Sequence, residues 1–311
     1  MTPRLAPRED EHDDGGGGTE RRGGRRPPVA PQLRVLLHHP ARYLAVCKPA
    51  DVRIDGDFRH TVLKLAHAYL RQSRRGDQLA QVRFVHRLDY ATSGVMLLAL
   101  SRPAAAAVSR QFESRLVQKS YVAIVHGAIL RRQFSVHARV ADRDKSDFLV
   151  RVAPQGRDSF TEGVVLEYGT FNGMKVSKVL LMPRSGRRHQ LRVHCALMGH
   201  AIVGDATYAS SSQHCRFAAR NAPKRMMLHA AALEVRLPPQ ADELPSRRRL
   251  RGERVRDISR RWPLHRLQAP DPLAERCIPQ LRLQPLNVAL LQRSASCPPR
   301  LQRRASWSQE P

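Results

Sequence analysis

Short apolar runs separated by polar loops fill most of residues 32–240 and predict a mixture of strands and helices. Runs rich in β-branched and long aliphatic residues are typical of strands that are buried in a sheet. They predict strands at 42–49, 82–85, 95–100, 119–125, 134–140, 164–171, 176–181 and, as the last strand, 226–237. Apolar residues at helical spacing predict helices at 60–72, from Ser101 onward and at 187–199. Residues 141–162 are polar, and we expect a mobile loop there.

The two ends of the chain differ in composition from this patterned part. Residues 1–31 are rich in Gly, Arg, Pro and acidic side chains, and such a segment cannot bury enough apolar surface to offset the entropy lost on ordering. After Pro238 the composition changes again, with nine arginines between Arg247 and Arg266. We therefore expect a disordered tail over 1–31, one domain over 32–240 and a mostly disordered, Arg-rich extension over 241–311.

The charge balance indicates a polyanionic partner. Lys and Arg number 54 against 27 Asp and Glu, a formal net charge of +27. We expect the arginines of 247–266 to add nonspecific RNA affinity that falls with salt, although basic clusters also resemble nuclear import signals. Aromatic residues make up only 5% of the chain, so surfaces on which bases can stack must be few.

Cysteine usage and the N-terminus bear on the compartment. The five cysteines are widely spaced and odd in number, which supports neither a disulfide framework nor a zinc site and favours a reducing compartment. No apolar run reaches the roughly 18 residues that a membrane helix needs. Acidic residues near the N-terminus argue against a secretory signal. We expect an intracellular protein, cytoplasmic or nuclear, while Arg21 to Arg26 keep a mitochondrial location open.

One polar loop interrupts two apolar strands and holds the strongest candidate for chemistry. The string His86-Arg87-Leu88-Asp89-Tyr90-Ala91-Thr92-Ser93-Gly94 lies between the runs 82–85 and 95–100. A polar loop clamped between buried strands is a typical place to hold a catalytic group rigidly, and Asp89 is the candidate. The alternative is a turn in which Asp, Thr and Ser side chains bond to their own backbone.

This string resembles motif II of the RluA-type pseudouridine synthases, His-Arg-Leu-Asp-x-x-Thr-Ser-Gly. Other segments resemble the same family in the expected order, over roughly residues 35–240. They are Cys47-Lys48-Pro49 (motif I), Lys119 to Ala123 (the tyrosine segment), Gly186 to His194 (motif III), Gly199-His200 with Gly204-Asp205-x-x-Tyr208, and Met227 to Ala230. The chain departs from the family pattern at Asp51, where Gly is usual, and at Arg188, where Thr or Ser is usual. It is most similar to the eukaryotic RNA pseudouridylate synthase domain-containing subgroup.

The resemblance implies a fold, a reaction and a catalytic set. The fold would be α+β, a mixed and largely antiparallel sheet flanked by helices, in a protein that we expect to be a monomer. The reaction would isomerise uridines of structured RNA, tRNA or rRNA, and needs no cofactor and no metal. By resemblance Asp89 is the catalytic carboxylate, acting as a nucleophile or as a base. Tyr121 would stack against the target base, and Arg192 would hold Asp89 ionised.

The RNA would be held around this catalytic set. A uridine in folded RNA must leave its stack to be reached, and cationic surface follows the phosphates. The resemblance places Arg87 in the groove, and we expect Lys48, Arg187, Arg188 and His189 to contact RNA near the site. Since residues 1–31 leave no room for a separate RNA-binding domain, substrate selection must depend on the catalytic domain, its loops or the tails.

Two other functions compete with this hypothesis. A metal hydrolase could draw on histidines and a carboxylate, but His189 and His194 are five residues apart and a helix would not place both on one face. The available side chains are His86, Asp89, His189, His194 and His200. The second alternative is a non-catalytic RNA-binding protein on a retained synthase fold. The presence of Asp89, Tyr121 and Arg192 argues against decay of the site.

Overall fold

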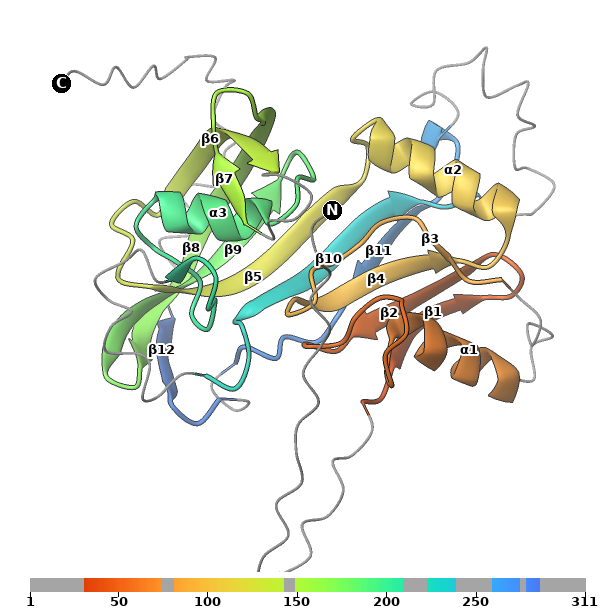
Figure 1. Ribbon diagram of the computed structural model, residues 1–311, viewed down its shortest axis with the longest axis horizontal. Helices are drawn as coiled ribbons and strands as arrows, with labels where there is room; N and C mark the ends of the chain where they lie inside the picture. The colour runs from red at the N-terminus through yellow and green to blue at the C-terminus, as the bar shows by residue number, and fades with distance from the viewer. Residues whose placement is uncertain are drawn as a thin grey trace, which may run out of the picture. The chain divides into compact units, whose positions relative to one another are not determined.

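The computed structural model describes residues 31–73, 81–142, 149–209, 223–238, 259–274 and 278–285. They form one twelve-stranded sheet with three helices (Figure 1). The helices are α1 (Val62–Gln72), α2 (Arg102–Glu113) and α3 (Gln190–Leu197). The strands are β1 (Arg34–His39), β2 (Tyr43–Lys48), β3 (Arg83–Phe84), β4 (Ser93–Ala99), β5 (Gln118–His126), β6 (Gln133–Asp142), β7 (Val150–Val152), β8 (Arg157–Phe171), β9 (Met174–Pro183), β10 (Leu228–Arg236), β11 (Leu264–Gln268) and β12 (Leu281–Pro285).

The sheet is mixed and mainly antiparallel, as expected for the α+β class. Its strand order is β1-β2-β4-β10-β5-β9-β8-β6-β7, with β3 on β4, β11 on β10 and β12 on β8. Among the described strands, β4 and β10 make the parallel pair, and the other neighbours are antiparallel. None of the described helices is both long and apolar enough to cross a membrane.

Two helices cover opposite faces of strands β2 and β4. Side chains of a strand alternate between its faces, so Leu44 and Val46 pack with α1 while Tyr43 and Ala45 pack with α2. Both helices begin at a hydroxyl cap: Thr61 Oγ1 accepts from the Lys64 N–H (3.1 Å), and Ser101 Oγ accepts from the Ala104 N–H (3.4 Å). The start of α2 was predicted at Ser101.

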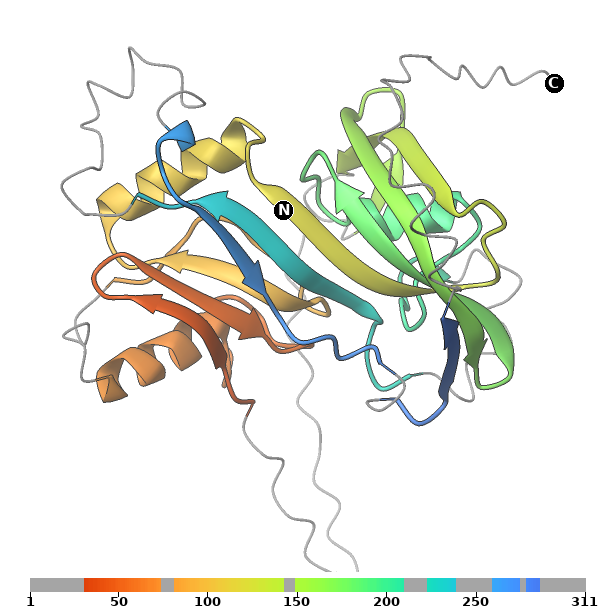
Figure 2. The ribbon, with the colours of Figure 1, turned by 180° about the vertical axis from the view of Figure 1, so that it is seen from behind.

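Two parts of the C-terminal extension, residues 259–274 and 278–285, pack on the sheet, whereas the sequence analysis expected 241–311 to be an appendage. Strand β11 pairs with β10 along five residues, and Figure 2 shows it, in blue, running beside β10, in cyan. Leu273 and Leu281 are fully buried against β5 and β9, and the Asp271 carboxylate lies 2.7 Å from the ammonium of Lys178. The arginine-rich composition hid these apolar positions. Residues 247–258 of the arginine-rich segment lie outside the described residues.

The starts of strand β8 and of helix α3 differ from the sequence prediction, for different reasons. Strand β8 begins at Arg157, inside the stretch 141–162 that was expected to be a loop, since Ser159 and Thr161 both contact the buried His194 (2.8 and 3.0 Å). Strand β7 also falls within that stretch, and residues 143–148 are not described. Helix α3 begins at Gln190 rather than 187, because His189 has a left-handed backbone (φ 52°).

Removing the C-terminal strands should therefore destabilise the domain. A chain ending at residue 240 loses the buried side chains of Trp262, Leu267, Leu273 and Leu281. At about 2 kcal/mol for each buried side chain, we expect the melting temperature to fall by at least about 10 °C. Thermal unfolding followed by circular dichroism measures it, with a chain ending at Pro285 as the control. Equal melting temperatures of the two truncated chains would contradict the role of β11 and β12.

Two buried histidines should make the fold sensitive to mild acid. Burial lowers the pKa of His194 to about 4, and burial with the nearby Arg225 lowers that of His229 to about 4, from 6.5. Between pH 7 and 5 the unfolded chain thus binds more protons than the folded one, and the free energy of unfolding decreases as the pH falls. Each histidine contributes about 2 kcal/mol to this loss at pH 5. Urea unfolding at pH 5, 6 and 7 measures it, and His194→Gln should flatten the slope. A stability that does not change over this range would refute the assignment.

Candidate active site

A cleft of about 1180 Å³ opens beside the loop between β3 and β4. Its walls are three segments that are distant in sequence. They are residues 53–58 before α1, residues 85–92 of the loop, and residues 183–192, which lead from β9 into α3. The floor includes Tyr121 of the central strand β5. The string that contains Asp89 therefore lines this cleft.

The Asp89 loop is fixed at both of its ends. On one side, the buried imidazole of His86 accepts a hydrogen bond from the Leu97 N–H (2.8 Å) and stacks on Phe112. On the other, Gly94 has φ 116°, and a Cβ there would lie 2.2 Å from the carbonyl oxygen of Ala230 on β10. Only glycine can occupy that position. Within the loop, the Thr92 N–H donates to the Asp89 carbonyl (3.1 Å) and closes a turn.

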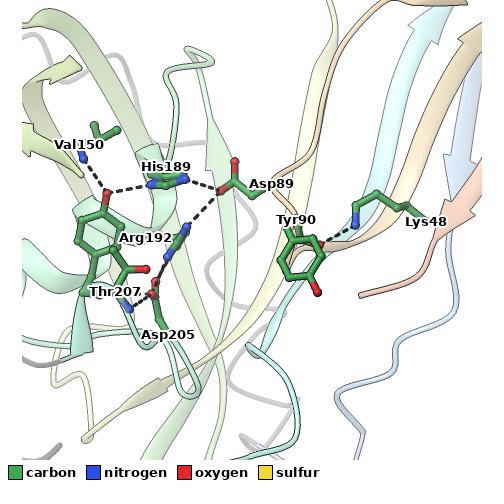
Figure 3. A network of polar contacts seen from close by, with 9 residues as sticks. Lys48, Asp89, Tyr90, Val150, His189, Arg192, Asp205 and Thr207 are labelled. Carbon is green, nitrogen blue, oxygen red and sulfur yellow. Dashed lines mark hydrogen bonds and ion pairs between the residues drawn. The ribbon is translucent and has the colours of Figure 1, made fainter. Parts of the chain in front are cut away.

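Lys48 is a structural residue, which corrects the expectation that it contacts RNA. Its side chain is fully buried at the end of β2, and its ammonium donates to the carbonyls of Pro49, Val52 and Tyr90 at 2.7–2.8 Å (Figure 3). Burial lowers the pKa of Lys48 to about 8, and the charges of Asp51 and Asp89 oppose that shift. The three hydrogen bonds join the turn after β2 to the residue that follows Asp89.

The Asp89 carboxylate faces two basic side chains from the start of α3. Its Oδ2 lies 3.9 Å from Nη1 of Arg192 and 4.0 Å from Nε2 of His189 (Figure 3). The Asp89 side chain is 28% exposed, whereas that of Arg192 is 9% exposed. Asp89 is thus the member of this group that a molecule in the cleft can reach. The resemblance to the family also implied that Arg192 lies next to Asp89.

Arg192 has a closer partner, which the sequence analysis did not assign a role. Its Nε and Nη2 donate to the two carboxylate oxygens of Asp205, both at 2.7 Å, and Asp205 is completely buried. Burial alone would lower the pKa of Arg192, but the hydrogen bonds and charge of Asp205, with the charge of Asp89, raise it overall. Because Asp205 occupies two of the three guanidinium nitrogens, Nη1 is left facing Asp89. The string Gly204-Asp205-x-x-Tyr208 was the available signal for this residue.

His189 is held by a second buried side chain of the same string. Its Nδ1 is 2.9 Å from the hydroxyl of Tyr208, which in turn accepts from the Val150 N–H (3.0 Å). Burial lowers the pKa of His189 below its usual value, and the neighbouring Arg192 does the same, although Asp89 opposes them. His189 therefore borders Asp89 from a fixed position in the wall of the cleft, with its side chain 14% exposed.

Tyr121 and the remaining basic residues complete the lining of the cleft. Burial, and then the charge of Asp89, raise the pKa of Tyr121, so its phenol stays protonated. Arg87 and Arg188 are exposed and line the cleft. Arg187 also lines it, and its Nε donates to the Asp158 carbonyl (3.2 Å). The cleft therefore combines the Asp89 carboxylate with a cationic rim.

The histidines considered for a metal site are engaged elsewhere. The His86 and His194 rings bond within the core, and His200 Nδ1 is 2.8 Å from the His126 carbonyl. Within the ranges that the structure describes, no three His, Cys, Asp or Glu side chains are grouped as a metal site requires. His189 and Asp89 are the two of these five candidates that lie near each other.

Comparison with known proteins agrees with this geometry. Residues 42–197 match the model of the RNA pseudouridylate synthase family. RNA pseudouridylate synthase domain-containing protein 1 of Danio rerio is 37% identical over 213 residues, 65% of this chain and 70% of that protein. The tRNA pseudouridine synthase C of Yersinia pestis is 38% identical over 177 residues, 54% of this chain and 69% of that protein.

A solved structure extends the similarity to most of the chain. Human RNA pseudouridylate synthase domain containing 1 matches with a TM-score of 0.64 and 30% identity, covering 88% of this chain and 99% of that one. The family match includes the loop of Asp89 and the start of α3. The chain therefore belongs to the RNA pseudouridylate synthase family, and its activity is the isomerisation of uridine to pseudouridine in RNA.

Proposed function

We propose that Asp89 is the catalytic carboxylate and that the target uridine enters the cleft beside it. The observation that carries this proposal is the position of Asp89, an acid of the cleft whose Oδ2 has Arg192 and His189 within 4.0 Å. The reaction detaches uracil from ribose, rotates it and rejoins it through carbon 5. Asp89 starts this sequence as a nucleophile or as a base, and both routes require the ionised carboxylate.

Arg192 supplies the charge that orients Asp89. A guanidinium at 3.9 Å attracts a carboxylate, and the surrounding low dielectric strengthens that attraction. Asp205 holds the guanidinium plane through two hydrogen bonds, so Nη1 meets Asp89 from a fixed direction. Asp205 therefore acts through Arg192 as a positioning residue, and it does not touch the substrate.

Tyr121 would form the surface against which the detached base turns. It comes from the central strand β5, between Ala230 of β10 and Leu181 of β9, and its ring lines the cleft. A rigid aromatic ring offers a uracil a stacking face without restricting rotation in its own plane. The phenol of Tyr121 stays neutral, because burial and then the negative charge of Asp89 raise its pKa and oppose its ionisation.

The cleft also suits a folded RNA. A uridine must leave its stack to reach Asp89, and Arg87, Arg187 and Arg188 would hold the phosphates around it. The Yersinia pestis relative is named for tRNA, so total tRNA is the first substrate to test. Selection among its uridines would come from the cleft walls, which are the described surface nearest the target.

Replacing Asp89 should abolish turnover and leave binding intact. The amide of Asp89→Asn keeps the size of the side chain but can be neither nucleophile nor base, so we expect tritium release from uridine carbon 5 of labelled tRNA to fall at least about 100-fold. Asp55→Asn is the matched control, because Asp55 is another carboxylate in the same cleft. Turnover of Asp89→Asn near that of the unmodified protein would remove Asp89 from the mechanism.

Loss of the two hydrogen bonds between Arg192 and Asp205 should affect the chemical step more than RNA binding. In Asp205→Asn the guanidinium of Arg192 is no longer fixed, and we expect kcat to fall about 10- to 100-fold with a smaller change in KM. Asp205→Glu should recover part of kcat, and Asp158→Asn, at an exposed ion pair, should change neither constant. Single-turnover tritium release with thermal melting separates a chemical defect from unfolding. If KM rises and kcat is retained, Arg192 is a phosphate contact instead.

A further inference from the structure

Two exposed aromatic rings line the Asp89 cleft, one from the wall segment 53–58 and one from the wall segment 85–92. Phe58 and Tyr90 are 46% and 51% exposed, and both line the cleft. The guanidinium carbon of Arg53 is 4.3 Å from the centroid of the Phe58 ring and 5.2 Å from that of Tyr90. A planar cation thus joins two π surfaces into one flat cluster, which we call the Arg53 stack (Arg53, Phe58 and Tyr90).

The backbone holds the Arg53 stack from three directions. The Tyr90 carbonyl accepts from the buried Lys48 ammonium (2.8 Å), and the Phe58 carbonyl accepts from Lys64 Nζ (2.6 Å). The Arg53 carbonyl accepts from the Val62 N–H at the start of α1 (2.9 Å). Rings on a fixed backbone lose little freedom when they bind a ligand, so the wall is organised before anything enters the cleft.

The charge of Arg53 is available to a ligand. Its guanidinium makes no ion pair or side-chain hydrogen bond with the residues that the structure describes, although Asp51, Asp55 and Asp57 are close in sequence. When a guanidinium stacks on rings, its N–H donors still point outward in its plane, where a phosphate can accept them. The wall therefore presents base-stacking surface and one unneutralised cation together.

The position relative to Asp89 suggests what the Arg53 stack binds. Tyr90 directly follows Asp89, and its ring lies on the opposite side of Asp89 from Arg192 and His189 (Figure 3). A uridine that flips toward Asp89 leaves its neighbours in the strand without a stacking partner. A neighbouring base would meet Tyr90 or Phe58, and the phosphate that links it to the target would meet Arg53.

We propose that the Arg53 stack is a second subsite, which stacks an unpaired base next to the target uridine. This inference rests on the proposed role of the Asp89 cleft. It makes the enzyme select uridines whose neighbour is unpaired, and purines, with their larger faces, should stack there best. Aromatic residues are only 5% of the chain, so two exposed rings joined by one guanidinium in this cleft are a notable stacking surface.

A binding experiment tests the subsite without depending on turnover. The probe is a single-stranded RNA of ten nucleotides with one uridine and 2-aminopurine beside it, whose fluorescence is quenched by stacking. The unmodified protein should quench it, and Phe58→Ala/Tyr90→Ala should lose the quenching and bind about 5- to 30-fold more weakly. Tyr90→Phe should retain both. Leu264→Ala and Val152→Ala, which remove exposed apolar side chains outside the cleft, should match the unmodified protein.

Kinetics on total tRNA separate this inference from the proposed function. For Phe58→Ala/Tyr90→Ala, KM should rise by more than kcat falls. Unchanged quenching and affinity would overturn the subsite, and so would a fall in kcat at constant KM, which would mean that the rings only position the Asp89 loop. If Asp89→Asn keeps its turnover while the quenching result stands, the catalytic assignment fails and the subsite survives.

Discussion

Arg192 and Asp205 meet through two hydrogen bonds of 2.7 Å in the wall of the cleft, and both side chains are buried. Burying an ion pair costs desolvation energy that a pair of apolar residues would not, so such a pair is weak evidence for stability alone. The geometry of the Arg192–Asp205 ion pair indicates a positioning role instead. Two nitrogens of the guanidinium are fixed by Asp205, and the third faces Asp89 at 3.9 Å. One buried carboxylate thereby sets the direction from which the accessible carboxylate is approached.

The same division between buried and accessible charge recurs on the other side of the loop. The ammonium of Lys48 is enclosed by three carbonyl oxygens, one of them from Tyr90, and this fixes the residue next to Asp89. Gly94 permits the close approach to β10 that ends the loop. Asp89 is therefore held between a lysine that cannot reach solvent and an arginine that barely does. These contacts limit the mobility of the Asp89 carboxylate.

Local patterns in the sequence were enough to locate most strands, the cap at Ser101 and the loop that holds Asp89. Those features depend on neighbours in the chain. The roles of Lys48 and Asp205 depend on partners 42 and 13 residues away, and a basic residue near a motif looks the same in sequence whether it meets RNA or a carbonyl. Strand β11 was missed because arginines dominate the composition around it, although Leu267 is buried, and β12 has a single fully buried position, Leu281.

The net charge of +27 explains attraction to RNA but no choice among uridines, since phosphates are the same everywhere along the chain. Choice requires contacts with bases. The aromatic rings that line the cleft include Tyr121, Phe58 and Tyr90, and each can contact a base by stacking. Tyr121 would meet the target uridine itself, which every substrate shares. Discrimination between sites must then arise from whatever meets the neighbouring nucleotides, and among the described residues of this wall that is the exposed pair of rings around Arg53.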